Sequence, residues 1–191
     1  MDYNLNLENS NIKKIIINET INKKNNNKKI IQEKVKEKKM RVETKTWGLN
    51  DTDLNHETQL NILNSILNKN SEKNKYNSIF ISHIKNKISS YKQQDILKKR
   101  LNEQSFINFD EVLKLLNSSN MKCHYCSEEM YILYERVREL KQWSLDRVNN
   151  NIGHNFGNLV IACLECNLKR RRTNKDAFMF TKNLVITREG L

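Results

Sequence analysis

Two C-x-x-C pairs, Cys123/Cys126 and Cys163/Cys166, constrain the fold of this chain more than any other feature of its sequence. They contain all 4 cysteines of the 191 residues, and 36 residues separate the first pair from the second. Four thiolates suit the tetrahedral coordination of a structural Zn²⁺, and a closed set of four leaves no position for a substrate. The spacing therefore predicts a folded unit in which bound zinc supplies much of the folding free energy.

Two alternatives to this zinc site have to be weighed. A redox-active C-x-x-C is the main one, but two such pairs in a basic chain favour a metal. His124 lies inside the first pair and is a possible competing ligand. We predict that it is a bystander, because the cysteines already complete a set of four.

The charge of the chain indicates its partner. There are 34 Lys and Arg residues against 22 Asp and Glu, a net charge of +12, which favours a polyanion such as nucleic acid, most simply DNA; solubility is the other explanation. No apolar run approaches the roughly 18 residues of a membrane span, and the start lacks the layout of a signal peptide. We expect an intracellular protein that is neither secreted nor membrane-bound, with an oligomeric state that the sequence leaves open.

Composition and periodicity divide the chain into three parts. Residues 1–45 are rich in Asn and Lys and are predicted to form a disordered tail, residues 46–117 a helical, basic region, and residues 118–191 the zinc-bound unit. The predicted helices rest on repeats at three and four residues: Leu60, Leu63 and Leu67; Phe80, Ile84, Ile88 and Tyr91; and Phe109, Val112, Leu113 and Leu116. Asp110 is the expected N-cap of the third helix.

The second predicted helix carries Lys85, Lys87 and Lys92 around Tyr91, and Asp95 is its only nearby acid. This arrangement is able to hold phosphates, although exposed lysines on a solvated helix face are the more common case.

The segment between the cysteine pairs predicts a strand, a loop, a second strand and a helix. Alternation predicts a strand over 143–148, glycines a loop over 149–157, an apolar run a strand over 158–163, and the pattern after it a helix over 164–172. A last helix after Asn174 is expected to bury Ala177, Phe178 and Phe180, with 184–186 closing the core. The predicted fold class is α+β: a mostly helical N-terminal region followed by a small zinc-stabilised ββα unit.

The segment LDRVNNNIGHNFGNLVIACLECNLKR resembles the motif of the HNH (ββα-metal, His-Me finger) endonucleases, over about residues 120–175. The four-cysteine frame around it resembles that of endonuclease VII-type resolvases, and the whole is similar to HNH proteins of large DNA viruses. In that resemblance Asp146 matches the first acid, Asn158 the central Asn and Asn167, nine residues further on, the helix position.

The resemblance implies a set of roles. Asp146 and Asn167 would hold a catalytic Mg²⁺ or Mn²⁺ through hard oxygen ligands, and Asn158 would cross-link the loop. The basic run at the helix end would contact the DNA backbone, where contacts position the protein without reading sequence. This run consists of Lys169, Arg170, Arg171 and Arg172.

One position departs from the motif. The family places its general base directly after the acid, and this chain has Arg147 there, which stays protonated and suits phosphate contact better than proton abstraction. His154 in the loop becomes the candidate base. The alternative is that His154 only caps backbone groups of a turn. If neither residue serves, the site uses bulk or metal-bound hydroxide, or it is inactive.

Three functions follow. The first is a metal-dependent HNH endonuclease that hydrolyses DNA phosphodiester bonds. The second is a zinc-stabilised nucleic-acid-binding module with an inactive HNH-like site. A zinc-stabilised protein-interaction module is the third, and the net charge of +12 disfavours it.

Overall fold

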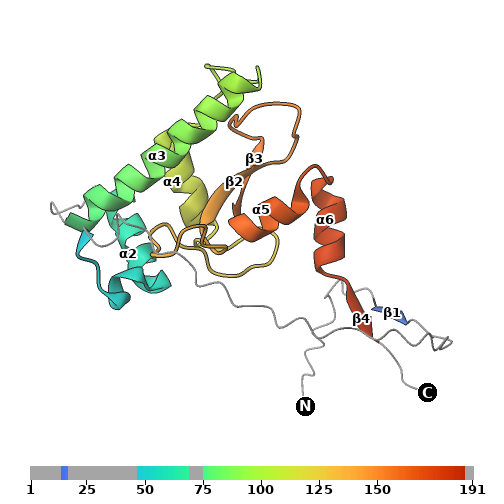
Figure 1. Ribbon diagram of the computed structural model, residues 1–191, viewed down its shortest axis with the longest axis horizontal. Helices are drawn as coiled ribbons and strands as arrows, with labels where there is room; N and C mark the ends of the chain where they lie inside the picture. The colour runs from blue at the N-terminus through green and yellow to red at the C-terminus, as the bar shows by residue number, and fades with distance from the viewer. Residues whose placement is uncertain (1–13, 17–46, 69–74, 188–191) are drawn as a thin grey trace, which may run out of the picture.

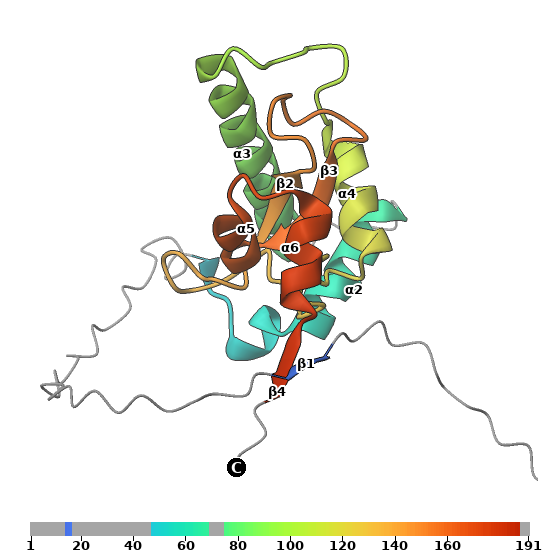
Figure 2. The same cartoon turned by 90° about the vertical axis from the view of Figure 1, so that its right-hand side faces the viewer.

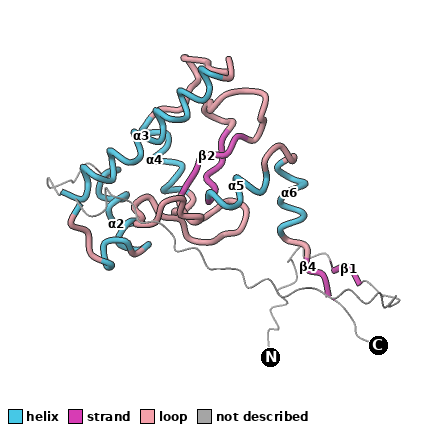
Figure 3. Tube along the Cα trace, in the orientation of Figure 1, coloured by secondary structure: helices cyan, strands magenta, loops and turns pink. Residues whose placement is uncertain are grey.

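The chain is α+β in this computed structural model, which describes residues 14–16, 47–68 and 75–187. Helices dominate the first half, and a two-stranded antiparallel sheet with two short helices follows (Figures 1 and 3). The α+β prediction is confirmed at this level. The predicted disordered tail lies outside the described residues, apart from β1 (Lys14–Ile16), which forms a strand.

Three helices follow the short 3-10 helix η1 (Asp51–Leu54): α2 (His56–Leu67), α3 (Lys75–Leu97) and α4 (Phe109–Ser118). The apolar repeats predicted these helices, and they bury Leu63, Phe80, Ile84 and Leu116. The prediction of Asp110 as an N-cap is wrong. Asn108 caps α4, and it forms a reciprocal pair with Glu111, whose backbone N–H it accepts at 2.9 Å. No helix in the described ranges is long and apolar enough to cross a bilayer.

A single apolar core joins the helical region to the cysteine-rich region. Buried side chains of α2, α3 and α4 belong to the same cluster as Trp143, Leu145 and Cys163. Gln59 on α2, fully buried, strengthens the connection, because its side chain bonds the backbone of Leu133 in both directions, at 2.9 and 3.0 Å. The predicted boundary between a helical region, 46–117, and a zinc-bound unit, 118–191, stays a prediction. In the structure, side chains from both ranges pack into one common core.

The hairpin of β2 (Trp143–Arg147) and β3 (Leu159–Cys163) lies at the centre of the second half. The register pairs Trp143 with Cys163 at one end and Arg147 with Leu159 at the other. Helix α5 (Leu164–Arg170) follows β3 without a break, so the predicted order of strand, loop, strand and helix is confirmed. In Figure 1, α3 and α4 lie on one side of this hairpin and α5 and α6 on the other.

Strand β2 is buried on both faces, because helices cover each of them. Tyr91 of α3 accepts the backbone N–H of Leu145 at 3.1 Å, whereas Asn167 of α5 donates to the Ser144 hydroxyl at 3.1 Å. The predicted alternation of side chains is present, but both sets are buried.

Helix α6 (Lys175–Lys182) begins at Asn174, whose side chain accepts the N–H groups of Asp176 and Ala177, and β4 (Val185–Thr187) follows it (Figure 2). Phe178 is buried against Tyr125, with ring centroids 5.0 Å apart. The prediction that Ala177 and Phe180 join the core is wrong: Ala177 is exposed and Phe180 is 47% exposed. The predicted closing segment forms β4, which pairs in parallel with β1.

Candidate metal centre and the polar site beside it

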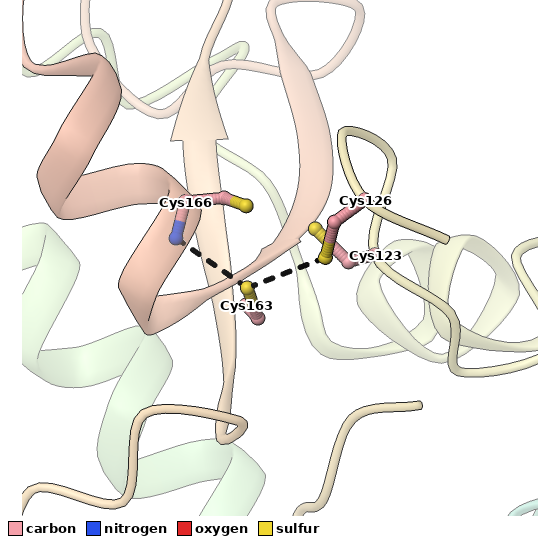
Figure 4. A group of neighbouring side chains, drawn as sticks. All are labelled: Cys123, Cys126, Cys163 and Cys166. Carbon is pink, nitrogen blue, oxygen red and sulfur yellow. Dashed lines mark hydrogen bonds between the residues drawn. The ribbon is translucent and has the colours of Figure 1, made fainter. Parts of the chain in front are cut away.

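The four cysteines converge on one point between the β2–β3 hairpin and the turn before it (Figure 4). Their four sulfur atoms lie within 4.8 Å of one another, and Cys126 Sγ is 3.9 Å from Cys163 Sγ. A tetrahedral zinc with sulfur bonds of about 2.3 Å places its sulfur atoms about 3.8 Å apart. The cluster therefore has the ligand type, number and spacing that a structural zinc requires.

Local backbone turns position these thiols. Cys123 and Cys126 lie in a tight turn, in which the backbone N–H of Tyr125 points at Cys123 Sγ at 3.4 Å. Cys163 is the last residue of β3 and also the N-cap of α5, and its sulfur accepts the N–H of Cys166 at 3.4 Å. Both pairs thus use N–H groups to stabilise negative charge on sulfur, which favours the thiolate form that binds metal.

The thiols also influence one another's ionisation. The pKa of Cys123 falls to about 4, mainly because the Cys163 thiol donates a hydrogen bond to it, although burial opposes the shift. The pKa of Cys163 rises far above its usual value for the same reason, and burial adds to the rise. Burial likewise raises the pKa of Cys166 to about 12. One thiolate forms readily in this cluster, and a cation is needed to stabilise the others.

The sulfur atoms are not bonded as disulfides, and all four thiols are free. All four meet in one cluster, whereas a redox pair needs only two, so the geometry favours a metal over the redox alternative. His124 is exposed and does not belong to the group of possible metal-binding side chains, in agreement with its predicted bystander position. Its backbone N–H instead bonds the carbonyl of Ile161 on β3 at 2.9 Å, which holds the turn against the hairpin.

Asp146, the predicted magnesium ligand, is buried at 3% exposure beside the cysteine cluster. Arg170 binds its carboxylate with two nitrogens: Nε lies 2.6 Å from Oδ2, and Nη2 lies 3.0 Å from Oδ1. The hydroxyl of Tyr125 donates to the same Oδ2 at 2.6 Å. Burial and this bond to Asp146 both raise the pKa of Tyr125. Since Tyr125 lies between the first two cysteines, Asp146 joins the cysteine turn to β2 and α5.

Arg170 corrects one prediction. It was expected to contact a DNA backbone, but its side chain is 0% exposed and binds Asp146 together with the carbonyls of Arg147 and Thr173. Burial lowers the pKa of a guanidinium, yet the Asp146 carboxylate outweighs burial and raises the pKa of Arg170. Lys169 pairs with Glu165 at 2.5 Å, and Arg171 and Arg172 are exposed. Only the last two remain free to meet a phosphate.

Asn167 and Asn158 occupy different places around the hairpin. The Asn167 amide nitrogen donates to the Leu145 carbonyl at 3.3 Å, so this side chain lies beside the residue that precedes Asp146. Asn158 accepts the N–H of Asn149 at 2.8 Å and donates to the carbonyls of Asn149 and Gly153 at 3.1 and 3.0 Å. It closes the loop between the strands, which is the structural role expected of it.

The two residues considered for the general base are both engaged elsewhere. Arg147 folds over the loop and donates to the carbonyls of Asn150 and Ile152 at 3.5 and 3.2 Å. Burial, more than its charged neighbours, lowers its pKa. His154 is 4% exposed, and its Nδ1 lies 3.0 Å from both oxygens of Asp95 on α3. Burial lowers the pKa of His154, and Asp95 only partly opposes this.

Asp95, fully buried, is the residue of this region that the sequence did not identify as part of a site. Its Oδ2 also accepts the backbone N–H of His154 at 2.6 Å, so it holds both the ring and the backbone of the loop. Tyr91 completes the group, with its ring centroid 4.5 Å from that of His154. The only signal in the sequence was that Asp95 stood as an isolated acid in a basic helix.

The three lysines predicted on α3 have different surroundings. Lys87 is half-buried: it donates to Gln142 Oε1 at 2.9 Å and to the Trp143 carbonyl, and it lies 4.9 Å from the Trp143 ring centre. The prediction that Lys87 binds phosphate is therefore wrong. Lys92 pairs with Glu103 at 2.8 Å, and Lys85 is exposed above the ring of Phe109 at 5.3 Å.

Comparison with known proteins gives no match: no family model, no curated protein and no solved structure aligns with this chain. The fold and the site by themselves define the class of this protein: an α+β protein with a four-cysteine cluster suited to zinc.

Proposed function

We propose that this chain is a zinc-stabilised, metal-dependent endonuclease of the HNH type that hydrolyses DNA phosphodiester bonds. One observation carries the proposal. The amide of Asn167 on α5 donates to the Ser144 hydroxyl at 3.1 Å and to the Leu145 carbonyl at 3.3 Å, so it lies at the two residues of β2 that precede Asp146, although 20 residues separate Asp146 from Asn167 in the sequence. The cysteine cluster at the start of α5 supports it, because it fixes the helix that carries Asn167.

The donor chemistry of this site suits a hard divalent cation. A carboxylate and an amide oxygen are ligands that Mg²⁺ and Mn²⁺ accept, with water and a phosphate oxygen completing the shell. Asn167 uses its nitrogen for hydrogen bonds, and no group in the described ranges donates to its oxygen. Such a cation would neutralise charge that develops on the scissile phosphate.

Asp146 sets a condition on this proposal. Both of its oxygens accept bonds from Arg170, so a cation at Asp146 has to share the carboxylate with the guanidinium or displace it from one oxygen. Arg170 would keep its bonds to the carbonyls of Arg147 and Thr173 in that exchange, which limits how far it has to move. Weakening the Arg170 ion pair costs free energy, and this cost is partly offset because the doubly charged cation attracts the Asp146 carboxylate more strongly than the singly charged guanidinium does.

His154 has the geometry of a positioning residue in this proposal. Asp95 holds Nδ1 of the ring, and the same carboxylate holds the backbone of the loop. Arg147 remains a cation at working pH and would stabilise negative charge near the site. The proton acceptor for the attacking water would then come from solvent.

The test is a supercoiled-plasmid assay with the zinc-loaded full chain in Mg²⁺ or Mn²⁺. Asn167→Ala is the informative variant, because Asp146→Ala also leaves Arg170 buried without its partner. Asn61→Ala, at an exposed position of α2, is the matched control. We expect relaxed plasmid from the parent and the control, and a loss of at least about tenfold in Asn167→Ala. Equal cleavage by all three would overturn the assignment of the site.

A second function is favoured by the same Asp146–Arg170 pair. If the guanidinium never leaves the carboxylate, the chain is a zinc-stabilised nucleic-acid-binding module with a closed HNH-like site. The plasmid assay separates the two: this alternative predicts that the parent shifts DNA on a gel but gives no relaxed product in either metal.

A further inference from the structure

A polar cavity lies at the end of the β2–β3 hairpin that is remote from the cysteines. It has a volume of about 580 Å³ and lies between the segment that follows α3, the loop after β2 and the turn from α5 to α6. In Figure 1 the end of α3 lies at the top of the molecule, the loop between β2 and β3 lies below it to the right, and the turn from α5 to α6 is lower on the same side. Arg100 and Arg172 contribute the charged groups of its wall, and neutral side chains form the rest: Val148, Asn149, Asn150, Asn151, Thr173 and Asn174.

The surface around this cavity is strongly basic. We call the six basic residues in these three segments and at the adjoining end of β2 the cationic end: Lys98, Lys99, Arg100, Arg147, Arg171 and Arg172. Within the described ranges none of the six forms an ion pair with a carboxylate. Asp95 and Asp146, the two acids that act on Arg147, are already bound, Asp95 by His154 and Asp146 by Arg170. Unneutralised cations around a cavity create a positive potential that attracts a polyanion.

The walls of the cavity are held in place before any ligand binds. Asn158 bonds both the N–H and the carbonyl of Asn149, and Arg147 bonds the carbonyl of Asn150. The Arg100 backbone N–H bonds the carbonyl of Asp95 at 2.8 Å, and Asp95 in turn bonds the loop at His154. The backbone of Arg100 and the loop are therefore fixed to the same carboxyl-bearing residue, so only the side chains that meet a ligand have to be ordered on binding.

We propose that this cavity holds the sugar–phosphate backbone of a nucleic-acid strand, with Arg100 and Arg172 contacting phosphates and the asparagine amides contacting sugars or base edges. Guanidinium groups bind phosphate oxygens with two parallel hydrogen bonds, and amides offer both donors and acceptors. The cations continue outside the cavity at Lys98, Lys99 and Arg171, which together with the lining arginines carry more positive charge than a single phosphate neutralises. This extent favours a strand over free phosphate. The inference rests on the proposed nucleic-acid function, and it names the contact surface that this function would use.

The test compares the full chain with Arg100→Gln/Arg172→Gln, using fluorescence anisotropy with a labelled 20-nucleotide strand and the matching duplex. Arg136→Gln/Arg138→Gln is the control, because these two arginines are exposed, form no ion pair in the described part of the chain and do not line the cavity. Both double variants lose two positive charges, so any difference between their DNA affinities reflects where the lost arginines lie.

We expect the cavity variant to bind DNA about tenfold more weakly than the control, because it loses two charge-assisted contacts. The slope of log affinity against log salt concentration should fall in magnitude by about 2 in the cavity variant. Equal affinity of the two variants would overturn the proposal and leave the nucleic-acid function standing. A parent chain that binds neither strand nor duplex would instead contradict the proposed function itself.

A second arm separates a strand from free phosphate. Inorganic phosphate is added at constant ionic strength to the parent bound to the labelled strand. We expect no displacement at millimolar phosphate, since the strand contacts several cations at once. Displacement at that concentration would assign the cavity to free phosphate and overturn the strand proposal.

Discussion

The two ends of the β2–β3 hairpin differ in almost every physical property. At the end where Trp143 pairs with Cys163, four thiols meet in a space closed by α5 and the Cys123–Cys126 turn. At the end where Arg147 pairs with Leu159, the chain opens into a loop that borders the polar cavity and the cationic end. Three residue pairs lie between these two end pairs, and they separate a closed, cysteine-lined end from an open, charged one. The first is suited to hold the fold and the second to meet a ligand.

Arg170 and Arg172, two positions apart in the sequence, differ in the same way. Arg170 is fully buried and paired with Asp146, whereas Arg172 is exposed and lines the cavity. A buried cation has to be paired, so Arg170 serves the structure; an exposed, unpaired cation is available to a partner. The basic residues 169–172 therefore do not form one uniform binding surface, and each has to be tested by its own substitution.

The largest expected effect comes from removing the metal at the closed end. A strong chelator, or Cys163→Ser, should unfold residues 120–180, because a structural zinc contributes apparent folding energies of about 10 kcal/mol in small domains. Circular dichroism and zinc content, measured together on the full chain, provide the check. A chain that keeps its helical signal and melting temperature after losing all metal would show that the cysteines do not hold the fold.

The next effect concerns the pair between the two ends. Asp146→Asn should destabilise the protein by about 3 kcal/mol, because it leaves the Arg170 guanidinium buried without its carboxylate. Asp146→Asn/Arg170→Met removes both charges and should recover much of that loss. Denaturant unfolding of the parent, the single and the double variant forms the test. A double variant that is less stable than the single one would show that the pair is not the reason for the loss.

A smaller effect is expected where the loop meets α3. A Cβ at Gly153 would lie 2.6 Å from the Arg100 carbonyl oxygen and 2.7 Å from Asp95 Oδ2, so Gly153→Ala should cost about 2 kcal/mol. Gly157→Ala is the control: nothing lies within 4 Å of its Cβ, and its φ of +82° alone should cost about 1 kcal/mol. Thermal melting measures both, and a larger loss in the control would contradict the close packing inferred at Gly153.

The smallest effect is a pH dependence at the same contact. Burial lowers the pKa of His154 in the folded chain, so between that pKa and the ordinary value of about 6.5 the unfolded chain binds more protons. The contribution of His154 to stability is thus complete above about pH 7 and declines as the pH falls below 6.5. The Asp95 carboxylate beside the ring opposes this lowering of the His154 pKa, whereas the positive charges of Arg147 and Lys98 add to it.

The measurement is the melting temperature between pH 5 and pH 8 for the parent and for His154→Gln. The parent should lose more stability at the acid end than the variant. A steeper acid loss in His154→Gln would mean that the imidazole stabilises the fold as a cation.

Features set by local spacing could be predicted from the sequence, and features set by distant partners could not. The cysteine pairs and the hairpin with α5 depend on short-range patterns, and the resemblance to the HNH motif implied the loop closure by Asn158; the structure has all of them. The burial of Arg170 depends on Asp146 on another element, and the position of His154 depends on Asp95, 59 residues earlier. No periodicity encodes such contacts. The same holds for Lys87, whose partners Gln142 and Trp143 lie more than 50 residues away.

The most direct test of the division between the two hairpin ends is hydrogen–deuterium exchange of the zinc-loaded full chain with and without saturating DNA. We expect slower exchange on DNA binding in residues 98–100, 148–157 and 171–174, and unchanged exchange at 121–126 and 163–166. Protection confined to the cysteine segments, with none at the cationic end, would contradict this division.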